Sequence, residues 1–211
     1  MPATAEPDIL SLLPPGRMGF TPAEPLSEDE FFDLCQRVDP LRLERDAKGT
    51  IVVMSPAGSY SSNRSGEIFG QLRKCTRSEE KGAAFDSSGE FPLPNGATRA
   101  PDAAWVSSER LEDLSAETKE KFLPLGPEFA VEVRSENDRR EDLEAKMREY
   151  VENGTRLSWL IDPQTETVTM YRKDGSSETL NRPERVEANA VVDGFTLPLA
   201  RIWEPLGESD A

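Results

Sequence analysis

The chain has 211 residues and carries 40 acidic against 25 basic side chains, a formal net charge of −15. It contains no histidine, which excludes Ser-His-Asp and Cys-His catalysis, a histidine-bearing zinc site and an imidazole proton shuttle from this chain. The charge argues against sequence-independent binding to a phosphate backbone, because such binding needs a basic surface. The length suggests one domain, or at most one and a half.

Cysteine usage and hydropathy indicate the compartment. Cys35 and Cys75 are too few for a disulfide framework and form no CxxC motif, so we expect two reduced thiols. The first residues have no basic segment followed by a long apolar one, and no run of about 18 apolar residues occurs in the chain. We therefore expect a cytoplasmic protein with no membrane span.

The N-terminal part is rich in proline. Residues 1–26 contain six prolines, a density that predicts an arm laid over the body or a disordered lead. Ser27 and Glu30 have the spacing of a capping box, so a helix is expected to start there and to end at Pro40. We expect a single domain over 27–204 and a frayed tail over 205–211.

Short strands and helices alternate along the rest of the chain. A tight turn is expected at Asn95-Gly96, joining strands over 90–93 and 103–107. Strands with interspersed helices, several joined by hairpin turns, indicate a mixed-sheet α/β or α+β fold. The other predicted elements are a hairpin over 41–45 and 51–54, helices over 62–75 and 137–152, strands over 83–87, 129–134, 157–161, 168–172 and 178–180, weak helical periodicity over 108–122, and a short apolar segment with a last helical turn over 191–204.

Glu132 is the most informative acidic residue, because it lies in the middle of the apolar strand over 129–134. An unpaired buried carboxylate would cost several kcal/mol, so Glu132 should have a cation, a metal ion or a proton beside it. The alternative is a half-exposed strand in which Glu132 faces water or pairs with Arg134 on the same face.

Asp102 and Lys146 are the other two candidates. Asp102 precedes the strand over 103–107, although an aspartate there often only satisfies local backbone N–H groups. Lys146 lies at the side of an apolar helical stripe, where its stem can follow the core boundary and its ammonium can reach the sheet edge. The alternative is an exposed lysine paired with Asp142 at i, i+4. The stripe consists of Leu143, Met147, Tyr150 and Val151.

The three candidates together indicate a site for a hard cation. Mg²⁺ takes oxygen ligands from one or two carboxylates and completes its shell with water and substrate phosphate. Asp102 and Glu132 would supply these carboxylates. Lys146 could orient a water or stabilise charge on a phosphoryl transition state. A bound divalent ion would also offset part of the repulsion between an acidic protein and phosphate.

Several segments, in this order and at this spacing, resemble the Uma-two family of restriction-endonuclease-like proteins, a branch of the PD-(D/E)XK nuclease superfamily. The similarity extends over about residues 27–204. The matching segments are LERDAKGTIVVMSPAG at 43–58, APDAAWVS at 100–107, PEFAVEVRS at 127–135, EDLEAKMREYVENGTRLSWLIDP at 141–163, VTMYR at 168–172 and DGFTLPLARIW at 193–203.

The resemblance implies a restriction-endonuclease-like mixed sheet flanked by helices. It also implies an endonuclease that depends on Mg²⁺ or Mn²⁺. Asp102 matches the first acid of the motif and Glu132 the second, and both would be metal ligands. The motif would place a lysine two residues after Glu132, where this chain has Arg134, which is effectively always protonated and cannot act as a base. The family commonly supplies the lysine from the following helix, which matches Lys146.

Other positions resemble the family less closely. Glu67 matches the optional extra acid of the superfamily, so Glu67 and Arg134 are accessory candidates. Glu44 also resembles a family acid, but the resemblance gives it no role. Ser61-Ser62-Asn63 stands where family members often carry a histidine before the first core helix.

Three functions stay open. The first is a Mg²⁺-dependent endonuclease acting on nucleic acid, with DNA favoured, and a homodimer could bring two sites to two strands. The second is a catalytically inactive nuclease-fold module for interaction or regulation, which the net charge, Arg134 and the missing histidine favour. The third is a metal-dependent enzyme acting on a small phosphate compound.

Overall fold

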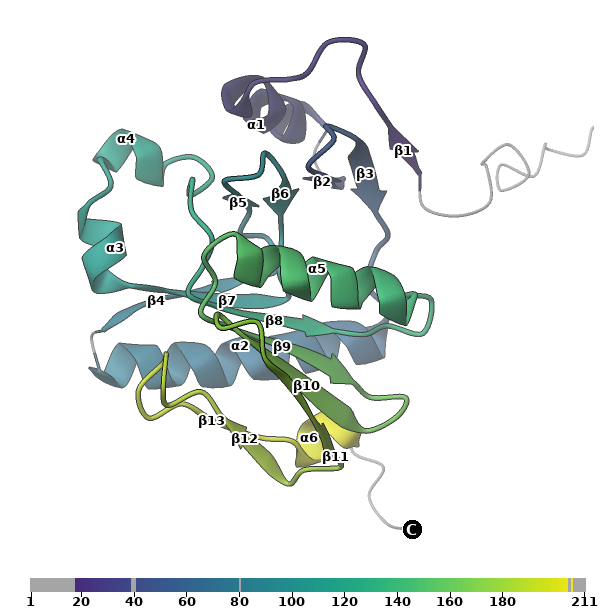
Figure 1. The fold of residues 1–211 in the computed structure, drawn as a ribbon, viewed down its shortest axis with the longest axis vertical. Helices are drawn as coiled ribbons and strands as arrows, with labels where there is room; N and C mark the ends of the chain where they lie inside the picture. The colour runs from purple at the N-terminus through teal and green to yellow at the C-terminus, as the bar shows by residue number, and fades with distance from the viewer. Residues whose placement is uncertain (1–17, 39–40, 80, 205, 207–211) are drawn as a thin grey trace, which may run out of the picture.

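A six-stranded mixed sheet forms the centre of the protein (Figure 1). The computed structural model describes residues 18–38, 41–79, 81–204 and 206. The strands are β4 (Gly82–Asp86), β7 (Ala103–Ser107), β8 (Phe129–Val133), β9 (Leu157–Asp162), β10 (Thr167–Arg172) and β11 (Ser177–Asn181). Their order in the sheet is β11-β10-β9-β8-β7-β4.

Two helices cover the two faces of this sheet (Figure 1): α2 (Ser59–Glu79) lies on one face and α5 (Arg140–Glu152) on the other. The β8 and β9 strands are parallel, whereas the other neighbours in the sheet are antiparallel. A parallel pair needs a crossover connection, and α5 supplies it. Every residue of β8 is therefore buried, as expected for a strand covered on both faces.

Side chains of β8 alternate between two hydrophobic cores, as the sequence predicts. Phe129, Val131 and Val133 face the α2 side, whereas Ala130 faces the α5 side. Because Glu132 has the parity of Ala130, it points toward α5. The expected apolar stripe of α5 is confirmed, since Leu143, Met147 and Tyr150 are buried and Val151 packs against them.

A smaller sheet lies beside α5, in the upper part of Figure 1. It is antiparallel, with strand order β1-β3-β2-β6-β5. Its core contains Phe31, Leu43 and Ile51. The elements of this region are β1 (Gly19–Phe20), α1 (Glu28–Arg37), β2 (Arg42–Arg45), β3 (Ile51–Met54), β5 (Phe91–Pro92) and β6 (Thr98–Arg99).

Short elements complete the fold. The α6 turn packs near α2 at the lower end of the molecule (Figure 1), and Trp203 and Ile202 contribute to the α2-side core. No helix among the described residues has the length and apolar character needed to span a membrane. The short elements are α3 (Ser108–Glu112), α4 (Ala116–Lys119), β12 (Arg185–Glu187), β13 (Thr196–Pro198) and α6 (Ala200–Trp203).

Most predicted elements agree with the structure, and the α+β class with a mixed sheet flanked by helices is confirmed. The capping box is present, with reciprocal bonds between Ser27 and Glu30. The Asn95-Gly96 turn was predicted to join the strands over 90–93 and 103–107. This prediction is wrong, because the turn joins β5 to β6. Two residues of β6 are too few to give a period-2 pattern, which explains why the sequence did not indicate them. Cys35 and Cys75 are not joined in a disulfide.

The predicted domain limits fall partly outside the described residues. Residues 1–17 of the proline-rich arm lie outside them, as do 205 and 207–211 of the tail. Within the arm, Gly19 and Phe20 form β1 and pair with Val52 and Ile51 of β3. The boundaries at 27–204 stay a prediction.

Candidate active site

Asp102 lies immediately before β7 and is held by two hydrogen bonds. The Ser65 hydroxyl on α2 donates to Oδ1 at 3.0 Å, and the backbone N–H of Val133 donates to Oδ2 at 2.8 Å. Burial raises the pKa of Asp102 despite these two donors and the nearby Lys146 charge. Asp102 is only partly buried, so solvent still reaches this end of the sheet.

Glu132 is buried, with 6% of its surface exposed. Its Oε1 accepts a hydrogen bond from the Tyr150 hydroxyl at 3.0 Å and lies 2.7 Å from Lys146 Nζ. Burial, with the charges of Asp102 and Glu44, raises the pKa of Glu132 to about 7, although Lys146 opposes this shift. The half-exposed strand with an Arg134 partner is therefore wrong.

Lys146 is mostly buried, with 10% of its side chain exposed. Its ammonium lies 2.6 Å from Glu44 Oε1 on β2, in addition to its contact with Glu132 on β8. Burial alone would lower the pKa of Lys146, but the two carboxylates raise it to about 12. The exposed lysine paired with Asp142 is thus wrong, and Lys146 carries a fixed positive charge at neutral pH.

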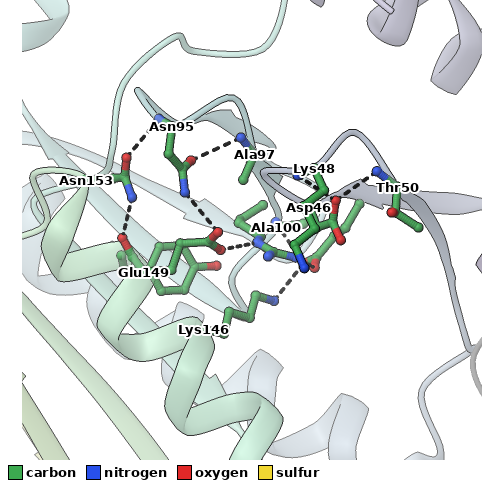
Figure 2. Close-up of polar contacts among 12 residues, drawn as sticks. Asp46, Lys48, Thr50, Asn95, Ala97, Ala100, Lys146, Glu149 and Asn153 are labelled. Carbon is green, nitrogen blue, oxygen red and sulfur yellow. Dashed lines mark hydrogen bonds and ion pairs between the residues drawn. The ribbon is translucent and has the colours of Figure 1, made fainter. Parts of the chain in front are cut away.

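Glu44 extends this cluster toward the small sheet. Its Oε2 lies 3.1 Å from Arg99 on β6, and its Oε1 also accepts a hydrogen bond from the Ala100 N–H. Arg99 in turn contacts Glu149 of α5 at 2.6 Å. Figure 2 shows Lys146 and Glu149 leaving α5 toward the segment that contains Ala100.

This cluster has more acidic than basic groups, but Glu44 and Glu149 are already paired with Arg99 or Lys146. Glu132 Oε2 makes no hydrogen bond or ion pair with any residue that the structure describes, so one oxygen is free for a further ligand. No group of three or more histidine, cysteine or acidic side chains within the described ranges could hold a metal ion. Two carboxylates agree with Mg²⁺ or Mn²⁺, which keeps several waters and takes oxygens from the substrate phosphate. The carboxylates of the cluster are Glu44, Asp102, Glu132 and Glu149, and its cations are Arg99 and Lys146.

The two accessory candidates lie apart from these contacts. Glu67 accepts a hydrogen bond from Gln71 at 2.6 Å and lies 3.6 Å from Arg201 of α6. Ser65 of α2 contacts Asp102. Glu67 is two residues further along the same helix, so its side chain points about 200° away from that of Ser65 around the helix axis. Arg134 contacts Asp162 of β9 at 3.0 Å and the Asp138 carbonyl at 3.2 Å.

Sequence reasoning did not place four residues at this site: Ser65, Arg99, Glu149 and Tyr150. Tyr150 follows Lys146 at i+4 on one helix, a spacing that could have indicated their proximity. Ser65 and Arg99 gave no signal, because their contacts depend on how α2 and β6 approach Asp102 and Glu44. Glu44 was noticed only through the family resemblance.

A further, partly buried carboxyl lies near Glu44. One oxygen of Glu90, Oε2, is buried and has no hydrogen-bond partner among the residues that the structure describes. Burial and the Glu44 charge raise the pKa of Glu90 to about 8. Burial and the Glu90 charge also raise the pKa of the Cys35 thiol to about 12, so this thiol stays protonated.

We expect Glu90→Gln to stabilise the protein at high pH. The ordinary pKa of this group is 4.5, so at intermediate pH the folded protein keeps a proton that the unfolded chain has lost. The stability of the wild type therefore falls as pH rises from 4.5 toward 8. Urea denaturation should give Glu90→Gln an advantage of about 1–2 kcal/mol at pH 9, and a smaller one at pH 6. The exposed control Glu120→Gln should show no such pH dependence, and an equal difference at both pH values would contradict this account.

Comparisons with known proteins agree with the fold and with the family that the sequence resembles. Residues 28–200 match the Uma2 family, described as "Putative restriction endonuclease". A crystal structure from Anabaena variabilis, described as a "putative nuclease belonging to DUF820", matches with a TM-score of 0.68 and 19% identity, covering 85% of this chain and 98% of that one. No curated protein matches this chain.

The family match includes most of the chain, and the likeness to the solved structure shows the same fold. The protein therefore belongs to the Uma2 family of restriction-endonuclease-like proteins.

Proposed function

We propose that this protein is a divalent-metal-dependent endonuclease that hydrolyses phosphodiester bonds in nucleic acid, with DNA as the favoured substrate. The observation that carries the proposal is the convergence of two motif carboxylates and one lysine. Glu132 lies 2.7 Å from Lys146, and Asp102 binds the backbone N–H of Val133, the residue after Glu132. Family membership and the nuclease-like fold agree with this assignment.

Asp102 and Glu132 are the proposed metal ligands. Asp102 is partly exposed, and Glu132 offers its free Oε2, so both can present an oxygen to an ion entering from solvent. Mg²⁺ or Mn²⁺, when bound, would supply Lewis-acid stabilisation of the phosphoryl oxygens.

Lys146 is the proposed third catalytic group, and its charge restricts what it can do. Because its pKa is raised to about 12, Lys146 holds its proton at neutral pH and cannot accept one from water. Its ammonium can orient the attacking water and stabilise negative charge on the transition state. We assign no catalytic step to Glu67 or Arg134, whose contacts lie elsewhere.

The alternative is a catalytically inactive nuclease-fold module for interaction or regulation. The net charge of −15 favours it, because an acidic protein repels nucleic acid. Incubation of the protein with Mg²⁺ or Mn²⁺ and single- or double-stranded DNA or RNA tests the two functions. Cleavage that depends on the metal supports the endonuclease, whereas no cleavage of any of the four favours the alternative. Small phosphate compounds in the same panel test the third function. A cytoplasmic location and a homodimer stay part of this proposal.

Metal binding gives a test that does not need a substrate. We expect Mn²⁺ at ten times its dissociation constant to stabilise the folded protein by about 1.4 kcal/mol. For a chain of this size, that corresponds to a rise of roughly 3–6 °C in Tm. Asp102→Asn keeps the shape of the side chain but loses its charge, and should show little of this rise. An equal rise in Asp102→Asn would place the bound ion at another site.

A further inference from the structure

Glu44 contacts the catalytic lysine from a different part of the fold. It lies on β2 of the small sheet, is 3% exposed, and its Oε1 lies 2.6 Å from Lys146 Nζ. The resemblance to the family gave this residue no role, and the endonuclease proposal does not use it. A buried glutamate at this distance from a proposed catalytic ammonium needs an explanation.

The surroundings of Glu44 fix its carboxylate. The Ala100 N–H donates to Oε1 at 3.1 Å, and Arg99 contacts Oε2 at 3.1 Å. Arg99 is tied to Glu149, whose other oxygen accepts a hydrogen bond from Asn95 at 3.0 Å. Figure 2 shows the Asn95 and Glu149 side chains meeting between the turn and α5. Glu44 is thus a rigid acceptor, held by backbone and by a chain of charged contacts.

Glu44 is a poor candidate for a metal ligand. Burial alone would raise its pKa, but Lys146 and Arg99 lower it, so Glu44 is ionised and its two oxygens each face a cation. Glu132 differs in this respect, because its Oε2 has no partner within the part of the chain that the structure describes.

Lys146 needs such a fixed acceptor. Its side chain has four rotatable carbon–carbon bonds, and a lysine loses up to about 2 kcal/mol of conformational entropy when held in one place. A single contact with Glu132 would leave the ammonium free to swing around that oxygen. A second contact from β2, at nearly the same distance, fixes its direction.

We propose that Glu44 is the positioning residue of this active site: it holds the Lys146 ammonium beside Glu132 and so couples the small sheet to the catalytic centre. The effect of Glu44 on catalysis rests on the proposed endonuclease function. Its effect on Lys146 does not, because it is a property of the protein without metal or substrate.

Glu44→Gln tests this proposal, since it keeps the length of the side chain and removes its charge. Glu128→Gln is a matched control: Glu128 is also buried and accepts a hydrogen bond from the Ser107 N–H at 2.7 Å, but it contacts no proposed site residue. In the full chain without metal, the rate at which an amine-acylating reagent modifies Lys146 is measured by mass spectrometry. We expect an increase of severalfold in Glu44→Gln and no change in Glu128→Gln. An unchanged rate in Glu44→Gln overturns the proposal.

Steady-state kinetics on a cleaved nucleic acid give the second measurement. We expect kcat to fall about 10–100-fold in Glu44→Gln, the size of effect found when the partner of an active-site group is removed. KM should change by less than about threefold, because Glu44 contacts no substrate in this account. Glu44→Asp keeps the charge and should recover part of kcat. A loss of Mn²⁺ affinity in Glu44→Gln as large as that in Asp102→Asn would make Glu44 a ligand and overturn the positioning role.

The two measurements separate the two proposals. If the wild type cleaves nothing but Lys146 is more reactive in Glu44→Gln, the positioning contact stands and the endonuclease proposal fails. If the wild type cleaves and Glu44→Gln has unchanged kcat and Lys146 reactivity, the endonuclease stands and the positioning role fails.

Discussion

Glu132→Gln should abolish most nucleic-acid cleavage while leaving the protein at least as stable as the wild type at pH 8. The substitution removes the proposed metal-ligand charge but keeps an oxygen that can accept from Tyr150 and Lys146. We expect kcat to fall by roughly 10²–10³-fold or more, as for loss of a group that stabilises the transition state directly. Initial rates of cleavage at saturating Mn²⁺ measure this loss.

The stability result distinguishes a catalytic residue from a structural one. Burial and the nearby acidic groups raise the pKa of Glu132 to about 7, so holding it ionised at pH 8 costs folding free energy. A neutral glutamine avoids that cost, and Lys146 still has Glu44 as a partner. Activity and stability should therefore change in opposite directions, as expected for a residue kept for function. Urea denaturation tests this, with Glu128→Gln as the buried control; a marked loss of stability in Glu132→Gln would make Glu132 a structural residue.

The fold could be predicted from the sequence where local patterns are long. The β8 alternation and the α5 stripe each extend over several residues, and both agree with the structure. The strand predicted to follow the Asn95-Gly96 turn was wrong. The strand that does follow it, β6, is only two residues long and shows no sequence pattern. The β12 strand has three residues and likewise gave no pattern.

The site could be predicted only in part, for a physical reason. Glu132 stood out because a carboxylate in a buried strand must have a partner, but the sequence could not say which one. The partners come from far along the chain: Glu44 lies 102 positions from Lys146, and Ser65 lies 37 from Asp102. Such contacts depend on how the small sheet and α2 pack against the central sheet, and a single sequence contains no local sign of that packing.

Lys146→Met should destabilise the protein strongly, because it removes a cation that contacts both Glu44 and Glu132. Breaking a buried ion pair from one side leaves uncompensated buried charge, which costs about 3–5 kcal/mol. Methionine keeps most of the apolar stem, so lost packing contributes little. Urea denaturation at pH 8 measures the loss. Lys173→Met, at an exposed lysine, should stay within about 0.5 kcal/mol of the wild type.

Two further measurements test whether the stability lost in Lys146→Met is due to charge: its dependence on pH, and the stability of a double variant. Without the ammonium, the buried carboxylates become harder to ionise, so the folded protein binds protons more tightly than the unfolded chain does. The destabilisation should therefore grow as pH rises and shrink as pH falls. Adding Glu44→Gln to Lys146→Met removes a buried carboxylate charge that has lost one of its two cations, and the double variant should be more stable than Lys146→Met alone. Because the two residues touch, their effects should not add. An additive result, or a loss independent of pH, would mean that Lys146 stabilises the fold by packing, and the electrostatic account of this site would be wrong.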